Sequence, residues 1–153
     1  MIICADDRLR QGPGRWNSSD LDTVYRQCWR DFKAALQDPE ITTAGIVLGC
    51  PGSGKSTWAA ANDSASTLLW DGVWDCPGKR TTVAEMVRKA GKTPVAVMVL
   101  APVDIAAARN NARPDWRRVP DRALRDAFWT LRVSPPRRCE GWARLDFTPT
   151  GHA

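Results

Sequence analysis

Short apolar runs alternate with helical stretches along this chain. Apolar runs predict strands at 44–48, 67–70 and 94–100, and weaker runs indicate strands at 1–4 and 143–147. In the stretch 21–36, apolar residues recur at spacings of three and four, which predicts an amphipathic helix. Further helices are expected at 55–61, 82–90, 103–110 and 121–131. This alternation predicts an α/β fold of three layers, in which helices cover both faces of a mostly parallel central sheet.

Composition narrows the class of protein. The chain has 153 residues, of which 43% are hydrophobic and 25% charged, so it suits a single domain over 1–153. No apolar run approaches the ~20 residues of a membrane helix, and the first residues do not resemble a signal peptide. We therefore expect a cytoplasmic protein with no membrane partner. The five cysteines are scattered and the one histidine is His152, so neither a zinc site, a disulfide framework nor histidine-dependent nucleophilic catalysis is expected.

Positive charge is concentrated in one part of the chain. The net charge is +5, and arginines crowd the stretch between Arg109 and Arg138, where only Asp115, Asp121 and Asp126 oppose them. This stretch is either a solvated helix face or a surface that binds the phosphates of a nucleotide or a nucleic acid. Lys79 and Arg80 can extend such a groove or form a solvated helix cap.

Residues 49–56 carry the strongest chemical signal. They read GCPGSGKS and match the phosphate-binding pattern Gly-x-x-x-x-Gly-Lys-[Ser/Thr] at every position, between an apolar strand and a helix. Glycines let the backbone N–H groups converge on phosphate oxygens, and the following helix adds the positive end of its dipole. Lys55 is expected to reach the β- and γ-phosphates of ATP, and the Ser56 hydroxyl to bind Mg²⁺.

A candidate acceptor site lies at the start of the chain. Asp7 stands three residues before Arg10, directly after the strand predicted at 1–4. A carboxylate in this place can accept the proton of an attacking hydroxyl, and a neighbouring arginine can hold a phosphate or orient the base. On spacing alone, a solvated turn explains the same residues.

Several segments together resemble the polynucleotide-kinase-like P-loop kinases. GCPGSGKSTWA, at 49–59, is similar to the P-loop of that family, and ICADDRLRQGPGRW, at 3–16, to its Asp-x-x-Arg segment. The family's lid, Arg-Asn-x-x-Arg before Val-Pro, resembles 109–113 and 119–120, and Glu140-Gly141-Trp142 resembles its Glu-Gly-aromatic segment. Asp71 is similar to the first residue of its Asp-x-Thr-Asn motif, whose Thr and Asn are absent here.

The resemblance implies a P-loop NTPase fold with an arginine-rich helical lid at 103–132, a P-loop unit at 44–61 and an acceptor-side unit at 1–40. It implies ATP and Mg²⁺ as cofactors. Asp7 is then the general base, with Asp6 as the alternative if the register shifts by one. Asp71 contacts Mg²⁺, through water, or the lid. The implied catalytic residues are Asp7, Arg10, Lys55, Arg109 and Arg113. The implied nucleotide-binding residues are Gly49, Cys50, Pro51, Gly52, Ser53, Gly54, Lys55, Ser56, Thr57, Arg109 and Arg113.

The order of the units departs from the family, in which the P-loop comes first. Here the Asp-x-x-Arg unit comes first, which indicates a permuted chain. We expect it to enter at an edge strand, cross to the central P-loop strand and then return to the strand between them. A rival interpretation makes Asp71 the general base and 1–40 an accessory element.

The acceptor is predicted from the aromatic and basic residues. The chain has eight tryptophans, and Trp16, Trp74, Trp116 and Trp129 either pack in the core or stack on bases. Arginines between these aromatics favour a nucleic-acid substrate, first a 5′-hydroxyl end of DNA or RNA. The alternatives are a hydroxymethylated pyrimidine such as hydroxymethyluracil within DNA, a small molecule, or no acceptor at all, in a nucleotide-binding module or ATPase switch.

Overall fold

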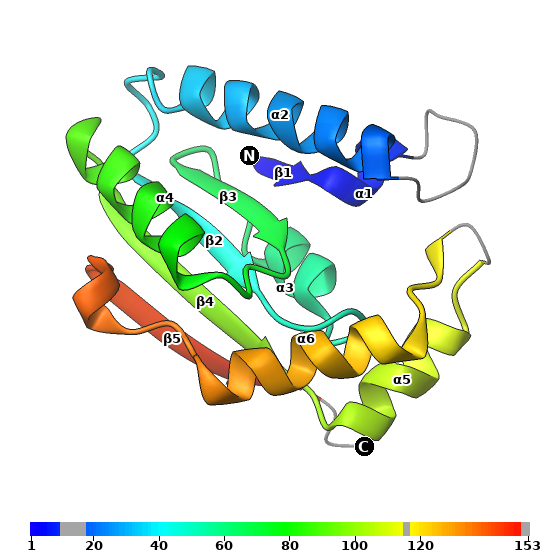
Figure 1. Cartoon of the computed structure of the whole chain (residues 1–153). Helices are drawn as coiled ribbons and strands as arrows, with labels where there is room; N and C mark the ends of the chain where they lie inside the picture. Colours follow the sequence, from blue (N-terminus) through cyan, green and yellow to red (C-terminus); the bar gives the residue numbers. More distant parts are fainter. Residues whose placement is uncertain (10–17, 115–116, 151–153) are drawn as a thin grey trace.

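The sheet is five-stranded and entirely parallel, with the strand order β1-β3-β2-β4-β5 (Figure 1). The structure, a computed structural model, describes residues 1–9, 18–114 and 117–150. The strands are β1 (Ile2–Cys4), β2 (Thr43–Leu48), β3 (Thr67–Gly72), β4 (Thr93–Leu100) and β5 (Arg144–Pro149). The chain enters at the edge strand β1, crosses to β2 at the centre and returns to β3 between them. The predicted order of these three strands is therefore confirmed.

Alternating residues of the central strands fill two separate cores. In β2, Ile46 and Leu48 face one core, whereas Val47 faces the other. In β4, Ala96 and Met98 alternate in the same way with Val95, Val97 and Val99. Successive side chains of a strand point to opposite faces, so a run that is apolar at every position is buried on both. This confirms the parallel α/β architecture predicted from the apolar runs.

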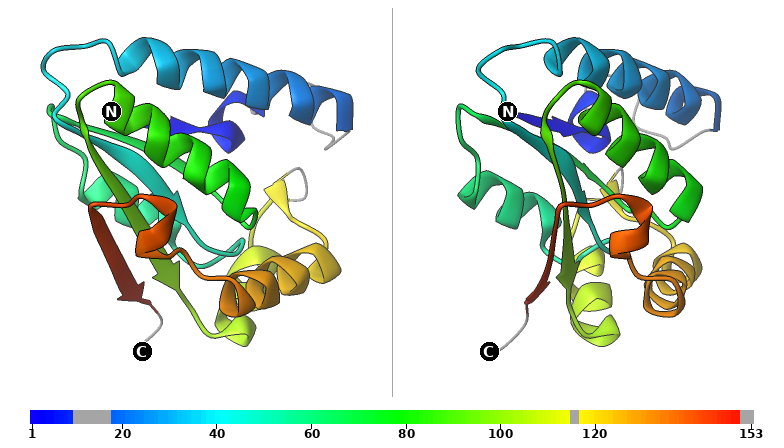
Figure 2. Two further views of the ribbon diagram at one scale, coloured as in Figure 1. Left: turned by 60° about the vertical axis from the view of Figure 1, so that its left-hand side comes forward. Right: turned by 90° about the vertical axis from the view of Figure 1, so that its left-hand side faces the viewer.

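Helices cover both faces of the sheet, as predicted. They are α1 (Ala5–Leu9), α2 (Ser18–Ala35), α3 (Lys55–Ala61), α4 (Pro77–Lys89), α5 (Val103–Asn111) and α6 (Asp121–Val133), with a short 3₁₀ turn at Arg138–Glu140. Figure 2 shows α2 and α4 on one side of the sheet and α3 on the other. The pair α5 and α6 lies beyond the carboxyl ends of the central strands (Figure 1). No helix in the described ranges has both the length and the apolar character to cross a membrane.

The structure excludes one local alternative and moves one helix boundary. The polar residues after β1 form the helix α1 rather than a turn. The helix expected from Thr82 begins at Pro77, because proline suits the first turn of a helix, where its missing N–H is not needed.

Arg80 was expected either to extend a basic groove or to form a solvated helix cap, and both interpretations were wrong. Its side chain is 0% exposed and forms an ion pair with Glu140, which is 8% exposed. The burial of a guanidinium requires such a partner.

Candidate functional site

The predicted phosphate-binding loop, residues 49–56, runs from the end of β2 into α3. Gly52 has a φ of 82°, and a Cβ added to it would lie 2.1 Å from the carbonyl oxygen of Ala106 in α5. Gly54, directly before α3, has a φ of 97°. Both positions therefore require glycine. The Ser53 hydroxyl is buried and has no hydrogen-bond partner among the described residues. An unpaired buried donor inside a loop of this kind is a feature that an anionic ligand satisfies.

Lys55 and Ser56 begin α3 and lie close to the end of β3. Lys55 Nζ donates a hydrogen bond to the carbonyl oxygen of Cys50 at 3.0 Å, so its ammonium lies over the loop. Ser56 Oγ donates to Asp71 Oδ2 at 2.5 Å. Strand β3 pairs directly with β2, the strand before the loop, and this pairing brings Asp71 to the hydroxyl. The remaining residues of the predicted loop, Cys50 and Pro51, are buried, whereas Thr57 is exposed on α3.

Asp71 is a buried carboxylate, only 5% exposed. Burial raises its pKa above the ordinary value, and the charges of Asp6 and Asp7 raise it further. The charge of Lys55 and the hydrogen bond from Ser56 oppose these effects without cancelling them. A cation beside this carboxylate would offset the cost of its burial.

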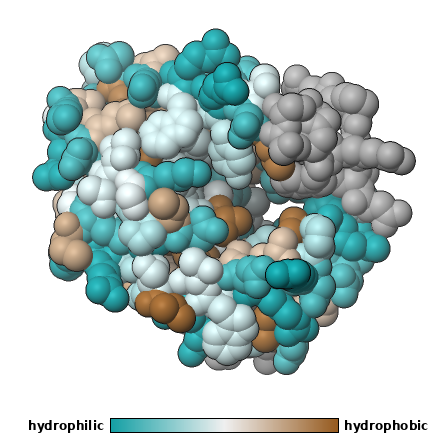
Figure 3. Space-filling view, viewed as in Figure 1, coloured by the Kyte–Doolittle hydropathy of each residue, from teal (hydrophilic) through white to brown (hydrophobic). Residues whose placement is uncertain are grey.

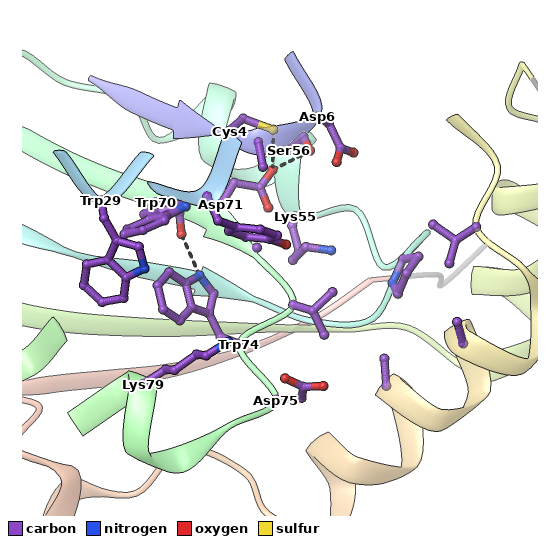
Figure 4. A pocket seen from close by; sticks show the side chains of 18 of the residues that line it. Cys4, Asp6, Trp29, Lys55, Ser56, Trp70, Asp71, Trp74, Asp75 and Lys79 are labelled. Atoms are coloured by element: carbon purple, nitrogen blue, oxygen red, sulfur yellow. Dashed lines mark hydrogen bonds between the residues drawn. The ribbon is translucent and has the colours of Figure 1, made fainter. Parts of the chain in front are cut away.

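A cavity of about 430 Å³ opens beside Lys55, Ser56 and Asp71. Figure 3 shows the surface hollowed between α2 above and the α5–α6 pair below. The other walls come from α1, α2, the segment after β3, the start of α4, the loop between α5 and α6, and α6 (Figure 4). The lining residues that carry polar or aromatic groups on the acceptor side are Asp6, Asp22, Tyr25, Trp29, Trp74, Asp75, Lys79 and Arg113.

The two neighbouring carboxylates of α1 have different positions. Asp6 lines the cavity and is 29% exposed, whereas Asp7 is not among the lining residues and is 60% exposed. Arg117 lies near both, with Nε 3.7 Å from Asp6 Oδ2 and Nη2 4.0 Å from Asp7 Oδ1. The geometry therefore brings Asp6, the alternative of the sequence prediction, to the cavity. Arg10 lies outside the described residues, and it is Arg8 that forms an ion pair with Asp31 of α2.

The predicted lid arginines are divided between two environments. Arg109 Nη1 donates a weak hydrogen bond to Thr150 Oγ1 at 3.5 Å, and Arg113 lines the cavity. In contrast, Arg122 and Arg125 pair with aspartates one turn away on the exposed face of α6. The arginine-rich stretch is thus partly a solvated face and partly a wall of the candidate site.

Asn110 holds the loop between α5 and α6 together. Its side chain is 1% exposed, donates to the carbonyl oxygen of Val119 at 2.7 Å and accepts from the N–H of Val119 at 3.1 Å. Val119 itself lines the cavity. This amide therefore determines where the segment with Arg113 lies.

The tryptophans proposed for base stacking also have different positions. Trp74 is 9% exposed, packs edge-on against Trp70 and lines the cavity. Trp129 is 57% exposed on α6 and packs against Phe128. Trp16 and Trp116 lie outside the described residues.

Sequence reasoning missed three contributors to the site. Asp22 and Tyr25 line the cavity from α2, and their i, i+3 spacing was the available signal, because it places both on one face of a helix. Thr150 has no signal in the sequence. Its hydroxyl donates to the carbonyl oxygen of Ser53 at 2.6 Å and thereby supports the phosphate-binding loop from the end of β5.

No protein-family model matches this chain, and no curated protein matches it.

Proposed function

We propose that this protein is an ATP-dependent P-loop kinase, which transfers the γ-phosphoryl group of ATP to a hydroxyl of an acceptor in the cavity. One observation carries the proposal. Lys55 and Ser56 of the predicted phosphate-binding loop, with Asp71 of β3, line a cavity of about 430 Å³ that extends to α1, α2 and the segment after β3. A volume of this size suits a small ligand or a nucleoside-sized unit. An ATPase or a nucleotide-driven switch activates only water and needs no such cavity.

The residues at the loop suit Mg²⁺ and a triphosphate. The Ser56 hydroxyl and the Asp71 carboxylate are the hard oxygen ligands that Mg²⁺ prefers, directly or through water. Among the described residues, no group of three or more His, Cys, Asp or Glu side chains could hold a metal. Such a pattern agrees with an ion that is held largely by phosphate oxygens. When bound, Mg²⁺ would neutralise charge on the β- and γ-phosphates.

The proposed roles of the chain's residues follow from their positions. Lys55 binds the transferring phosphate, while Arg109 and Arg113 approach it from the lid. Asp6 accepts the proton of the acceptor hydroxyl as its oxygen bonds to the γ-phosphorus, and the bond from that phosphorus to the β–γ bridging oxygen breaks to release ADP. We assign this role to Asp6 because it lines the cavity and Asp7 does not. Asp71 is less suited, since its hydrogen bond with Ser56 ties it to the metal side.

We propose a nucleic-acid hydroxyl as the acceptor, first a 5′-hydroxyl end. The aromatic rings of Tyr25, Trp29 and Trp74 in the cavity wall support this, because bases stack on such rings. One observation favours the second candidate, a hydroxymethylated pyrimidine of DNA. Among the residues the structure describes, Asp22 and Asp75 have no hydrogen-bond or ion-pair partner, so their carboxylates are available to accept from base N–H groups.

Transfer of label from γ-labelled ATP with Mg²⁺ tests the proposal. The acceptors are a 5′-hydroxyl oligonucleotide, a 5′-phosphorylated duplex with hydroxymethyluracil, and the same duplex unmodified. Lys55→Ala is the inactive control, and Lys89→Ala, exposed at the far end of α4, is the matched active control. Label on the first acceptor alone indicates an end kinase, and label on the second alone a DNA-base kinase. ATP hydrolysis that no candidate acceptor stimulates would contradict the kinase proposal.

Two adjacent carboxylates provide a matched pair for the proposed base. Asp6→Asn should lower the transfer rate by about 10²–10⁴-fold, the usual contribution of a general base. Asp7→Asn removes an equal charge near Arg117 and should lower the transfer rate much less. The reverse order of effects would return the role to Asp7.

A further inference from the structure

Arg80, on α4, makes hydrogen bonds with all three of its nitrogen atoms. Nε and Nη2 donate to the two carboxylate oxygens of Glu140 at 3.0 and 2.6 Å. Nη1 donates to the carbonyl oxygen of Trp74 at 3.0 Å, and Nη2 also reaches the carbonyl oxygen of Pro135 at 3.4 Å. Glu140 in turn accepts from the indole N–H of Trp142 at 3.0 Å. A buried ion pair thus connects the segment before β5 with the segment after β3.

The residue that receives the third contact has an unusual backbone. Trp74 has a φ of 55°, a value that bulky side chains seldom adopt. Its indole N–H donates to the carbonyl oxygen of Trp70 at 3.2 Å, and its ring packs edge-on against Trp70 and Trp29 at 4.8 and 6.2 Å between centroids. A strained residue persists only where its surroundings determine its conformation, and such residues cluster at binding sites.

These features meet at one wall of the cavity. The segment from Gly72 to Asp75 lines it, together with Trp29 and Trp70 (Figure 4). For stability alone, a buried ion pair is no better than apolar side chains of similar volume. It does, however, fix the direction of each group that it contacts, here the Trp74 carbonyl.

We propose that Arg80 is a positioning residue for the acceptor: held by Glu140, it fixes Trp74 as a rigid aromatic wall, so that the cavity selects an acceptor with a planar ring beside its reactive hydroxyl. This inference rests on the proposed function, because it assigns the cavity to the acceptor. Arg80 acts through Trp74 and does not itself line the cavity.

The decisive variant is the double substitution Arg80→Met with Glu140→Leu. A single substitution would leave one buried charge unpaired and threaten folding, whereas the apolar pair keeps the volume filled. Arg138→Ala is the matched control, because Arg138 lies in the same 3₁₀ turn as Glu140 but is exposed, and its side chain donates to the carbonyl oxygen of Ala143 rather than to the segment with Trp74. The near-ultraviolet circular dichroism of the coupled indoles reports the position of Trp74 without any activity.

We expect the double variant to stay folded and to bind Mg²⁺·ATP as the native protein does. Its indole signal should change, and its KM for the labelled acceptor should rise about tenfold, the value of one lost ring contact, with a smaller change in kcat. Unchanged acceptor KM and indole signal would overturn the proposal. So would an equal loss of ATP affinity, which would indicate general disorder.

A binding measurement separates this inference from the kinase proposal. The dissociation constants of the 5′-hydroxyl oligonucleotide and of the hydroxymethyluracil duplex are measured by fluorescence anisotropy without ATP. Binding that weakens about tenfold in the double variant but not in Arg138→Ala supports the proposed role of Arg80 and Trp74, even if no phosphate is transferred. Binding that is unchanged in the double variant, or absent in the native protein, overturns it even if the protein is an active kinase.

Discussion

The conformation of the loop between α5 and α6 should depend on one buried amide, that of Asn110. The replacement Asn110→Leu keeps a side chain of similar size but removes both hydrogen bonds to Val119, at 2.7 and 3.1 Å. Each such bond contributes about 1 kcal/mol net. The free energy that holds the loop in its native conformation should therefore fall by about 2 kcal/mol, which lowers the ratio of native to locally opened loop about 30-fold. Val119 is half-buried, so water can hydrogen-bond in part to its freed backbone groups, and we do not expect a larger loss of free energy.

A second substitution makes the prediction sharper. Asn110→Asp places a carboxyl at the same position, and its protonated form can both donate to the Val119 carbonyl and accept from the Val119 N–H. Its ionised form cannot donate. The folded-state pKa of the introduced carboxyl is therefore raised above its unfolded value. At low pH the variant should therefore be about as stable as the native protein. Its free energy of unfolding relative to the native protein should fall as the pH rises through the folded pKa.

Urea unfolding and hydrogen exchange of the Val119 amide measure these effects. Asn111→Leu, the exposed neighbour on the same helix, is the control and should change neither. The reasoning is refuted if Asn110→Leu leaves Val119 protection unchanged. It is also refuted if the difference between Asn110→Asp and native protein does not vary with pH. Because the loop carries Arg113 into the cavity wall, Asn110→Leu should also lower the transfer rate.

Three further predictions concern the loop and its surroundings. Asp71→Asn should abolish Mg²⁺-dependent transfer yet stabilise the protein at neutral pH. Burial raises the Asp71 pKa, so the native protein loses stability as the pH rises from 3.8 towards that pKa, whereas the variant does not. Urea unfolding midpoints of both proteins across this pH range test the prediction. Gly52→Ala should weaken ATP binding at least about tenfold in calorimetry, because the added methyl group meets the Ala106 carbonyl at a positive φ; native affinity would disprove this account of the loop. Thiol labelling of native protein should reach the exposed Cys76 and Cys139 first. Labelling of the half-buried Cys4 should be slower, because partial burial and the neighbouring Asp71 raise its pKa to about 12. Mass spectrometry identifies the sites, and early labelling of Cys4 would contradict this raised pKa.

Much of the architecture could be predicted from local patterns. An apolar run such as 94–100 leaves few alternatives to a buried parallel strand, and the glycines at 52 and 54 have the freedom that a tight anion-binding turn requires. The order of β1, β2 and β3 was predicted from the resemblance to a family with a different order of units, and the right-handed crossover rule was compatible with it. The strand predictions and the glycine turn conformations succeeded because each depends on residues that are close together in the chain.

The details of the candidate site depend on tertiary contacts instead. Adjacent residues on a helix point about 100° apart, so only the packing of α1 decides that Asp6 lines the cavity while Asp7 is exposed. Arg80 can be buried because it pairs with Glu140, which lies in a distant segment of the chain. The sequence around α4 gives no sign of this partner. The sequence alone thus determined the parallel sheet and indicated the phosphate-binding loop. The folded chain decided which charged side chains meet, because the burial of a charge is set by partners far away in sequence.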